Sequence, residues 1–523
     1  MSDHPTVAVV GAGFSGLLTA LRILLAPDGP RVALIEKGPR FGRGAAYSTA
    51  SPHHLLNVRA TNMSALVEQP GHFLDWLGAE GVANPESVFV TRDRYGQYLQ
   101  SLLRDAAADT ASRRLSLEHD AVSAITREGD RWRVDLAMGR TISADAVVLA
   151  LGNLPPSIPA GVAPAVLSSP RYVAEPWTWK GPGASSGGDI LLVGAGMTAV
   201  DVALTIHDER PDIRLFALSR HGLTPRVHGP ALSAAGLWGT APSGSPARLL
   251  AEVRRRSQTD WRGTIDSLRP HVQAIWRGWS VAERRRFLRH LRPWWNVHRH
   301  RLAPEVAARI DVMRQSGHLA FAGGRLHSLT LQPDGVLATW TARGSEAPET
   351  RLFSQVVNCT GPSGDLTAVD DPLIAGLLDD GLVRPDACRL GIDVDARSRV
   401  IDRGGAPADH LFAVGPLTRG QFYEITSVPD IRLQAADCAD SILNMLALKA
   451  RSQRSGEGAK AGAARLADAL SAFIAESIAE LDVELGSLKF ARRVRGAWEL
   501  RGRRAALGEI ALWLDERRDG EGP

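Results

Sequence analysis

Two stretches of the chain each combine a short apolar strand, a glycine-rich turn and the start of a helix. The first is Val7–Ala20, VAVVGAGFSGLLTA, and the second is Ile190–Leu204, ILLVGAGMTAVDVAL. Apolar runs of this length before such a turn are typical of strands buried on both faces of a parallel sheet. The duplication therefore predicts an α/β chain with two Rossmann-like domains, each built on its own parallel sheet.

The first turn carries a complete pattern for binding a dinucleotide. Gly11, Gly13 and Gly16 give G-x-G-x-x-G, in which the glycines make the turn, admit a pyrophosphate and allow close strand–helix packing. The following helix offers free N–H groups to the phosphates. The next strand, RVALIEK, ends in Glu36, about twenty residues after Gly16, where an acidic residue binds ribose hydroxyls. The pattern predicts an adenosine without a ribose phosphate, as in FAD or NAD.

The second turn differs from the first at the end of its second strand. Gly194, Gly196 and Ala199 give G-x-G-x-x-A, and the strand IRLFALSRHG then ends in Ser219 and Arg220. A hydroxyl and a cation suit a 2′-phosphate, so NADPH is favoured over NADH; alternatively, Arg220 is an ordinary surface residue. Two dinucleotide sites imply FAD and a nicotinamide cofactor, with hydride passing from nicotinamide to flavin.

Three further glycines and an arginine are candidates for contacts with the cofactors. The strands ADAVVLALGN and SQVVNCTGP end at Gly152 and Gly361, as return strands of nucleotide-binding domains do. A third strand, HLFAVGP, ends at Gly415, and a helix is predicted to start near Pro429 and to contain Arg432. The N-terminus of that helix would favour the negative charge that a reduced flavin carries.

This order of motifs predicts that one domain is interrupted by the other. Residues 1–165 and 351–445 are expected to form a split FAD domain around an NAD(P) domain at 186–350. A helical insert rich in arginine and tryptophan is expected at about 225–320. The region 446–523 reads as a polar linker and an amphipathic helical tail, which favours packing or homo-oligomer contact over a membrane anchor.

Composition excludes several other classes of protein. The chain has 523 residues, 44% of them hydrophobic, which is enough for more than one core. A net charge of +4 gives little support to a nucleic-acid partner, and three scattered cysteines argue against disulfides and zinc. The N-terminus leads directly into a strand, and no apolar run is long enough to cross a membrane, so a cytoplasmic protein is expected.

The insert contains candidate substrate contacts within RRRFLRHLRPWWNVHRHR, residues 284–301. A basic aromatic run can bind nucleic acid, but such runs are more often solvated helix faces. His298 and Arg299 are candidates for binding an anionic substrate, as is Arg59, although a structural cluster of salt bridges is the more frequent role. No cysteines or clustered carboxylates accompany the histidines, so no metal is expected.

Several longer stretches carry a resemblance to a known family. They are GRGAAYST (42–49), HLLNVRATNMS (54–64), RDRYGQYL (92–99), VHRHRLAPEVAARI (297–310) and GPLTRGQFYEITSVPDIRLQA (415–435). With the two glycine turns, the chain resembles flavoproteins with two dinucleotide-binding domains, and within them the YdhS-like FAD/NAD(P)-binding family. That family includes bacterial FAD-dependent urate hydroxylase and a nitrosuccinate-forming aspartate N-monooxygenase. Pro416 departs from the pattern, because many such flavoproteins have an aspartate there.

The resemblance implies an FAD-dependent, NAD(P)H-consuming monooxygenase that uses O₂ to hydroxylate a small polar anionic substrate. Urate, hydroxylated at its 5-position, is the first substrate hypothesis, and N-hydroxylation of an amino acid such as aspartate is the alternative. A third hypothesis is a non-oxygenating redox or regulatory protein that binds the same two cofactors. The catalytic residues beyond the flavin are not identified by the sequence.

Overall fold

The computed structural model describes residues 4–49, 51–108, 114–183, 187–229, 238–454, 470 and 473–479. The chain divides into two units, Met1–Leu443 and Asn444–Pro523. The first unit holds both glycine turns and all three sheets. Most of the predicted helical tail, and the oligomer contact expected of it, lie outside the described residues.

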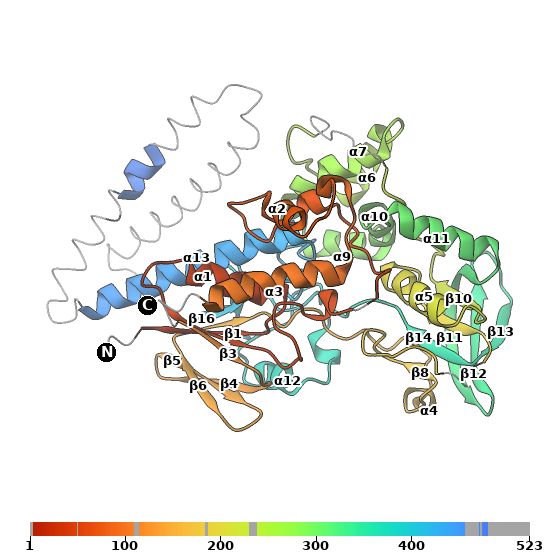
Figure 1. The fold of residues 1–523 in the computed structure, drawn as a ribbon, viewed down its shortest axis with the longest axis horizontal. Coiled ribbons are helices and arrows are strands. Elements are labelled where there is room, and N and C mark those ends of the chain that lie inside the picture. Colours follow the sequence, from red (N-terminus) through yellow and green to blue (C-terminus); the bar gives the residue numbers. More distant parts are fainter. Residues whose placement is uncertain are drawn as a thin grey trace. The chain divides into compact units, whose positions relative to one another are not determined.

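The first sheet is assembled from two distant parts of the chain (Figure 1). Its strand order is β15-β16-β7-β1-β2-β3, parallel from β16 to β3 and antiparallel only between β15 and β16. The strands are β1 (Thr6–Val10), β2 (Arg31–Ile35), β3 (Leu115–Glu118), β7 (Ala146–Leu149), β15 (Arg399–Ile401) and β16 (Pro407–Ala413). Because β7 and β16 pair directly, residues that precede the second sheet in the chain and residues that follow it belong to one sheet.

The second sheet follows the second glycine turn. Its order is β13-β12-β11-β10-β9-β14-β8, parallel from β11 to β8 and antiparallel from β11 to β13. The strands are β8 (Tyr172–Val173), β9 (Ile190–Val193), β10 (Leu215–Ser219), β11 (Leu319–Gln332), β12 (Gly335–Ala342), β13 (Pro348–Phe353) and β14 (Gln355–Asn358). The sheet therefore extends beyond the predicted limits of 186–350 at both ends, since β8 precedes them and β14 follows them.

Helices cover these sheets as the sequence pattern predicts. In Figure 1, α1 and α3 lie on one side of the first sheet, and the three-stranded sheet lies on the other. That small sheet consists of β4 (Val122–Glu128), β5 (Arg131–Leu136) and β6 (Thr141–Ala144). The helices outside the insert are α1 (Phe14–Leu24), α2 (His72–Ala79), α3 (Arg92–Ala108), α4 (Pro164–Leu167), α5 (Met197–Glu209), α12 (Pro372–Asp379) and α13 (Val428–Arg454). The predicted fold class, with an NAD(P)-type domain inserted into an FAD-type domain, is confirmed.

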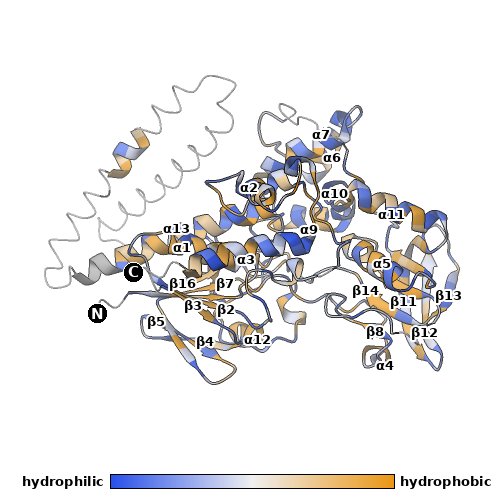
Figure 2. Cartoon of the chain, viewed as in Figure 1, coloured by the Kyte–Doolittle hydropathy of each residue, from blue (hydrophilic) through white to orange (hydrophobic). Residues whose placement is uncertain are grey.

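The insert between β10 and β11 is helical, as expected. Its helices are α6 (Pro246–Arg256), α7 (Trp261–Leu268), α8 (Val272–Gly278), α9 (Val281–His290), α10 (Arg292–Arg299) and α11 (Pro304–Gln315). Ser280 begins α9 with a capping box, in which its hydroxyl accepts from the Glu283 N–H. The exposed α9 is mostly hydrophilic (Figure 2), whereas Trp276 is buried and stacks on Tyr423, with ring centroids 4.4 Å apart. Tryptophan in this insert therefore builds a core shared with the segment after β16.

Among the described residues, no helix is long and apolar enough to cross a membrane.

Candidate functional site

The first glycine turn has a geometry that only glycine can adopt. Gly11 has φ +98°, and a Cβ atom placed on it would lie 2.4 Å from the carbonyl oxygen of Ala150. A Cβ atom on Gly16 would lie 1.9 Å from the carbonyl oxygen of Gly11. Both distances are impossible for a real side chain, so the turn holds β1, β7 and α1 in close contact.

Gly13 is different, because a Cβ atom there would not clash with the protein. A Cβ atom on Gly13 would meet its nearest neighbour, Gly44 Cα, at 3.5 Å, which is ordinary van der Waals contact. Gly13 is also the N-cap residue of α1 and provides no side chain to satisfy the first N–H groups of that helix. Free N–H groups beside a residue without a side chain fit the close approach of a pyrophosphate.

Glu36 is fixed in front of the same turn. Its two carboxylate oxygens accept hydrogen bonds from the backbone N–H groups of Ala12, at 2.9 Å, and Gly38, at 2.7 Å. A carboxylate has about four lone-pair positions, so two accepted bonds leave capacity for ribose hydroxyls. The residue fits the proposed role in binding the adenosine ribose of FAD.

The segment after β16 returns to the start of α1. Gly415 has φ +81°, and a Cβ atom there would lie 2.3 Å from Ser15 Oγ, so no larger residue fits. Its N–H donates to the side chain of Gln434 on α13 at 2.8 Å. Arg432, two residues earlier on α13, donates to the carbonyl of Ser64 at 2.9 Å. The structure thus brings Gly415 to the first glycine turn, and it joins Arg432 to the stretch 54–64.

The second glycine turn repeats the arrangement of the first. Gly194 has φ +128°, and its Cβ atom would lie 2.3 Å from the carbonyl oxygen of Cys359 at the end of β14. A Cβ atom placed on Gly196 would meet no described neighbour within 4 Å, and Ala199 is buried. Gly152 and Gly361 follow the two return strands, with φ +75° and +83°. The correspondence supports a second dinucleotide site at this turn.

Positive side chains gather at the carboxyl end of β10. Ser219 ends the strand and its hydroxyl accepts a hydrogen bond from Gly222 N–H at 3.1 Å, while Arg220 is exposed. Arg343 lies 2.9 Å from Nδ1 of His221. Burial lowers the pKa of His221, and the positive charges of Arg343 and Arg220 lower it further. This end of the strand is positive, as the proposed 2′-phosphate contact of Arg220 requires.

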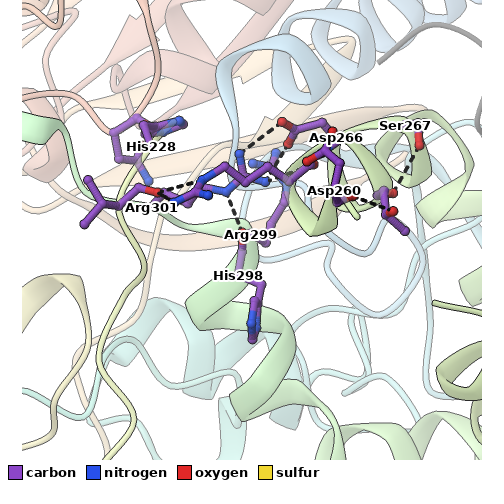
Figure 3. Close-up of polar contacts among 12 residues, drawn as sticks. His228, Asp260, Asp266, Ser267, His298, Arg299 and Arg301 are labelled. Carbon is purple, nitrogen blue, oxygen red and sulfur yellow. Dashed lines mark hydrogen bonds and ion pairs between the residues drawn. The ribbon is translucent and has the colours of Figure 1, made fainter. Parts of the chain in front are cut away.

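Arg59 and His298 each bond to a different backbone carbonyl group, and the two side chains do not form a common anion site. Arg59 donates to the carbonyl of Gly229 at 2.8 Å and lies over the ring of Phe89, 5.2 Å from its centroid. His298 donates through Nδ1 to the carbonyl of Trp294 at 2.8 Å. Figure 3 shows the imidazole of His298 pointing away from the ion pair of Arg301 with Asp266.

His298 instead borders a cavity of about 640 Å³ at the junction of the insert with the second sheet. Trp261, Arg262 and Arg314 line the same cavity. Arg262 donates to the carbonyl of Val227, at 3.2 Å from Nη2. A substrate contact by Arg59 or His298 stays a prediction.

Arg299 has a carboxylate partner that the sequence did not reveal. Its Nε lies 3.5 Å from Oε2 of Glu424, and His300 Nε2 lies 3.7 Å from the same oxygen. The other oxygen, Oε1, accepts a hydrogen bond from Trp295 Nε1 at 2.7 Å. Burial disfavours the charged carboxylate, but the charges of His300 and Arg299 favour it more, so the pKa of Glu424 lies below its ordinary value. The insert and the segment after β16 therefore share a buried polar cluster.

Glu424 could have been suspected from one feature of the sequence. It stands in GQFYEITSVPD, where an acidic residue lies between aromatic and apolar neighbours. In the structure it adopts φ +70°, which is uncommon for glutamate. Residues Ala413 and Leu149 pair at the carboxyl edge of the first sheet, where ligands of such sheets bind. The segment that carries Glu424 starts from that edge.

Comparison with known protein families gives a match that covers the first of the two glycine turns. A protein family described as FAD-NAD(P)-binding matches residues 8–154, which include Gly11, Gly13, Gly16 and Glu36. The chain contains an FAD/NAD(P)-binding domain. The finer assignment to YdhS-like urate hydroxylases is not confirmed by this match.

One curated relative and two solved structures extend the comparison. A Baeyer–Villiger monooxygenase from Streptomyces coelicolor is 27% identical over 232 residues, or 43% of this chain and 40% of that protein. The chain thus matches well under half of the length of that relative. The ornithine hydroxylase of Pseudomonas aeruginosa has a TM-score of 0.59, with 15% identity over 85% of this chain and 99% of that one. The L-lysine 6-monooxygenase of Pseudomonas syringae has a TM-score of 0.58, with 16% identity over 84% and 99%. These two structures share the fold.

Proposed function

We propose that the protein is an FAD-dependent monooxygenase that consumes NADPH and O₂ to hydroxylate a small polar substrate. In such a reaction substrate, O₂, NADPH and a proton give hydroxylated substrate, water and NADP⁺. FAD supplies the redox chemistry and the activation of O₂ when it is bound. The protein contributes the two dinucleotide sites, their mutual placement and the binding of substrate.

The repeated turn is the observation that carries this proposal. Gly11 packs against Ala150 as Gly194 packs against Cys359, so each sheet has one turn suited to a pyrophosphate. Glu36 at one turn and Arg220 at the other differ in charge, which supports a plain ribose at the first and a ribose phosphate at the second. We take the first site to hold the flavin and the second to bind the nicotinamide cofactor.

The substrate class that we propose differs from urate, the first hypothesis drawn from the sequence. Urate hydroxylation rested on resemblance, and no comparison supports it. The similar structures are an ornithine hydroxylase and an L-lysine 6-monooxygenase, which supports the alternative of N-hydroxylation of an amino acid. The pairing of Arg299 with Glu424 also fits an amino acid, because this pair offers one group of each sign.

A non-oxygenating redox or regulatory protein is the competing function, and one experiment separates the two. Purified protein with bound FAD is given NADPH, O₂ and a panel of amino acids and purines, and NADPH oxidation, O₂ uptake and peroxide release are followed together. A monooxygenase consumes NADPH and O₂ in equal amounts, faster with its substrate, and releases little peroxide. NADPH oxidation that no compound accelerates, or that releases equal peroxide throughout, would contradict the proposal.

A further inference from the structure

The buried cluster around Arg299 and Glu424 contains polar atoms that the protein leaves unsatisfied. The side chains of Arg299 and Glu424 are 9% and 7% exposed. Nε and Nη2 of Arg299 and Oε2 of Glu424 are buried and have no hydrogen-bond partner in the described part of the chain. The ion-pair distance of 3.5 Å is longer than a good N–H···O bond. Buried charged groups without such bonds are costly, so these atoms are suited to a ligand.

Two neighbouring arginines, Arg269 and Arg301, are by contrast already used by the protein. Arg269 donates to Ser427 at 3.0 Å and lies 3.4 Å from Asp430. Arg301 is buried and donates to both oxygens of Asp266, at 3.0 and 2.8 Å. Arg299 and Glu424 are thus an adjacent cation and anion that both retain unused hydrogen-bonding atoms, and Arg419, whose charge also interacts with Glu424, retains one at Nε.

The backbone at Glu424 adds a second, independent observation. Glutamate at φ +70° lies in the left-handed region, which costs free energy for a residue with a long side chain. Such strain persists where the surrounding structure imposes it, and it occurs often at ligand-binding sites. Here the strain accompanies a carboxylate held by Trp295 beside Arg299, at 2.7 Å from the indole nitrogen.

We propose that Arg299 and Glu424 together bind the head group of an α-amino acid, with Arg299 holding its carboxylate and Glu424 its ammonium. This inference rests on the proposed function and names the substrate class of that site. A simple anion such as urate or a dicarboxylate would pair with Arg299 but would also face the carboxylate of Glu424. A zwitterion satisfies both charges, so the cluster discriminates against anions that lack an ammonium.

The first test uses the unmodified protein with bound FAD and varies only the ligand. Calorimetry measures binding of the standard α-amino acids and L-ornithine, and then of two derivatives of the tightest binder. One derivative lacks the amino group, and the other has an amide in place of the α-carboxylate. Each should bind at least about 10-fold more weakly, the loss expected when one charged hydrogen bond is removed. Absence of binding by any amino acid, or equal binding of the deaminated acid, would overturn the proposal.

The second test assigns each end of the ligand to a residue. Glu424→Gln should remove most of the preference for the amino acid over its deaminated acid, and Arg299→Gln should remove the preference for carboxylate over amide. Asp266→Asn is the matched control, because it weakens another ion pair of the same insert and should leave both preferences unchanged. If Glu424→Gln weakened all ligands equally, or if Asp266→Asn acted in the same way, the assignment would be wrong. The ligand series with the unmodified protein decides the matter if a variant does not fold.

Failure of this inference and failure of the proposed function are distinguishable. Binding of an amino acid that depends on Glu424, without any coupled O₂ consumption, supports the head-group site and contradicts the monooxygenase. Coupled hydroxylation of a compound that is not an amino acid supports the monooxygenase and contradicts the head-group site.

Discussion

Arg92, the first residue of α3, donates a hydrogen bond from Nη2 to the carboxylate of Asp201 on α5 at 3.0 Å. Asp201 is only 3% exposed, so this is a nearly buried ion pair between the two nucleotide-binding domains. His54 strengthens the same contact, because its Nε2 lies 3.0 Å from the backbone carbonyl of Asp201 and 2.9 Å from the hydroxyl of Thr205. The two cofactor sites are therefore held in a defined orientation.

Breaking this pair should destabilise the protein. Asp201→Asn leaves the Arg92 guanidinium partly buried without its carboxylate, and we expect a loss of roughly 3 kcal/mol in the free energy of unfolding, the lower end for a broken buried ion pair. Urea unfolding with saturating FAD measures this loss. The double variant Arg92→Met, Asp201→Leu should recover part of it, because no uncompensated charge remains. A loss that was the same in the single and double variants would show that the charges do not interact.

Flavin binding should depend on the absence of a side chain at Gly13. Gly13→Val places two methyl groups where the pyrophosphate of FAD would approach, so the purified protein should be colourless, with little absorbance near the flavin bands. Gly376→Val on α12 is the control, because a Cβ atom there meets no described neighbour within 4 Å. That variant should remain yellow. Full flavin occupancy in Gly13→Val would refute the assignment of this turn.

Discrimination between NADPH and NADH should depend on Arg220. Arg220→Gln removes the cation at the end of β10 and should weaken NADPH binding by about 1–3 kcal/mol, while NADH binding changes little. Arg214→Gln provides the control, because Arg214 is exposed just before the opposite end of the same strand. The measurement is the ratio of kcat/KM for the two cofactors. If the unmodified protein used both cofactors equally, Arg220 would not contact a phosphate.

The buried His54 should make stability fall in mild acid. Burial lowers the pKa of His54 in spite of the carboxylate of Asp201, and Arg92 and His53 lower it further. Below about pH 6.5 the unfolded chain binds a proton at this histidine that the folded protein does not, so folding stability decreases as the pH falls from about 7 towards the folded pKa.

The matching experiment compares urea unfolding at several pH values in that range. His54→Gln should show a shallower decrease in stability with falling pH than the unmodified protein. The exposed His119 serves as control, and His119→Gln should leave the slope unchanged. An identical slope in His54→Gln would mean that this histidine does not contribute to acid sensitivity.

The local units of the fold were predictable from the sequence. Gly11, Gly16 and Gly194 stand where backbone contacts and left-handed φ angles exclude a side chain, and such requirements act on single residues. The buried strands beside them show as apolar runs, because both faces of a parallel sheet are covered. Two dinucleotide-binding units, their order and the helical insert therefore follow from patterns a few residues long.

Tertiary structure alone decided which distant residues meet. β14 pairs with β9 and so belongs to the inserted sheet. Its sequence is similar to that of β7, which pairs with β1 in the first sheet, so the sequence alone does not show to which sheet β14 belongs. The sequence does not identify the partners of Glu424, and only the fold places Arg299 and Trp295 beside it. Hydrogen bonding between strands and the burial of a charge depend on neighbours far away in the chain. A local pattern specifies the turn that a segment makes, whereas the partner of a buried charge is specified only when the whole chain has packed.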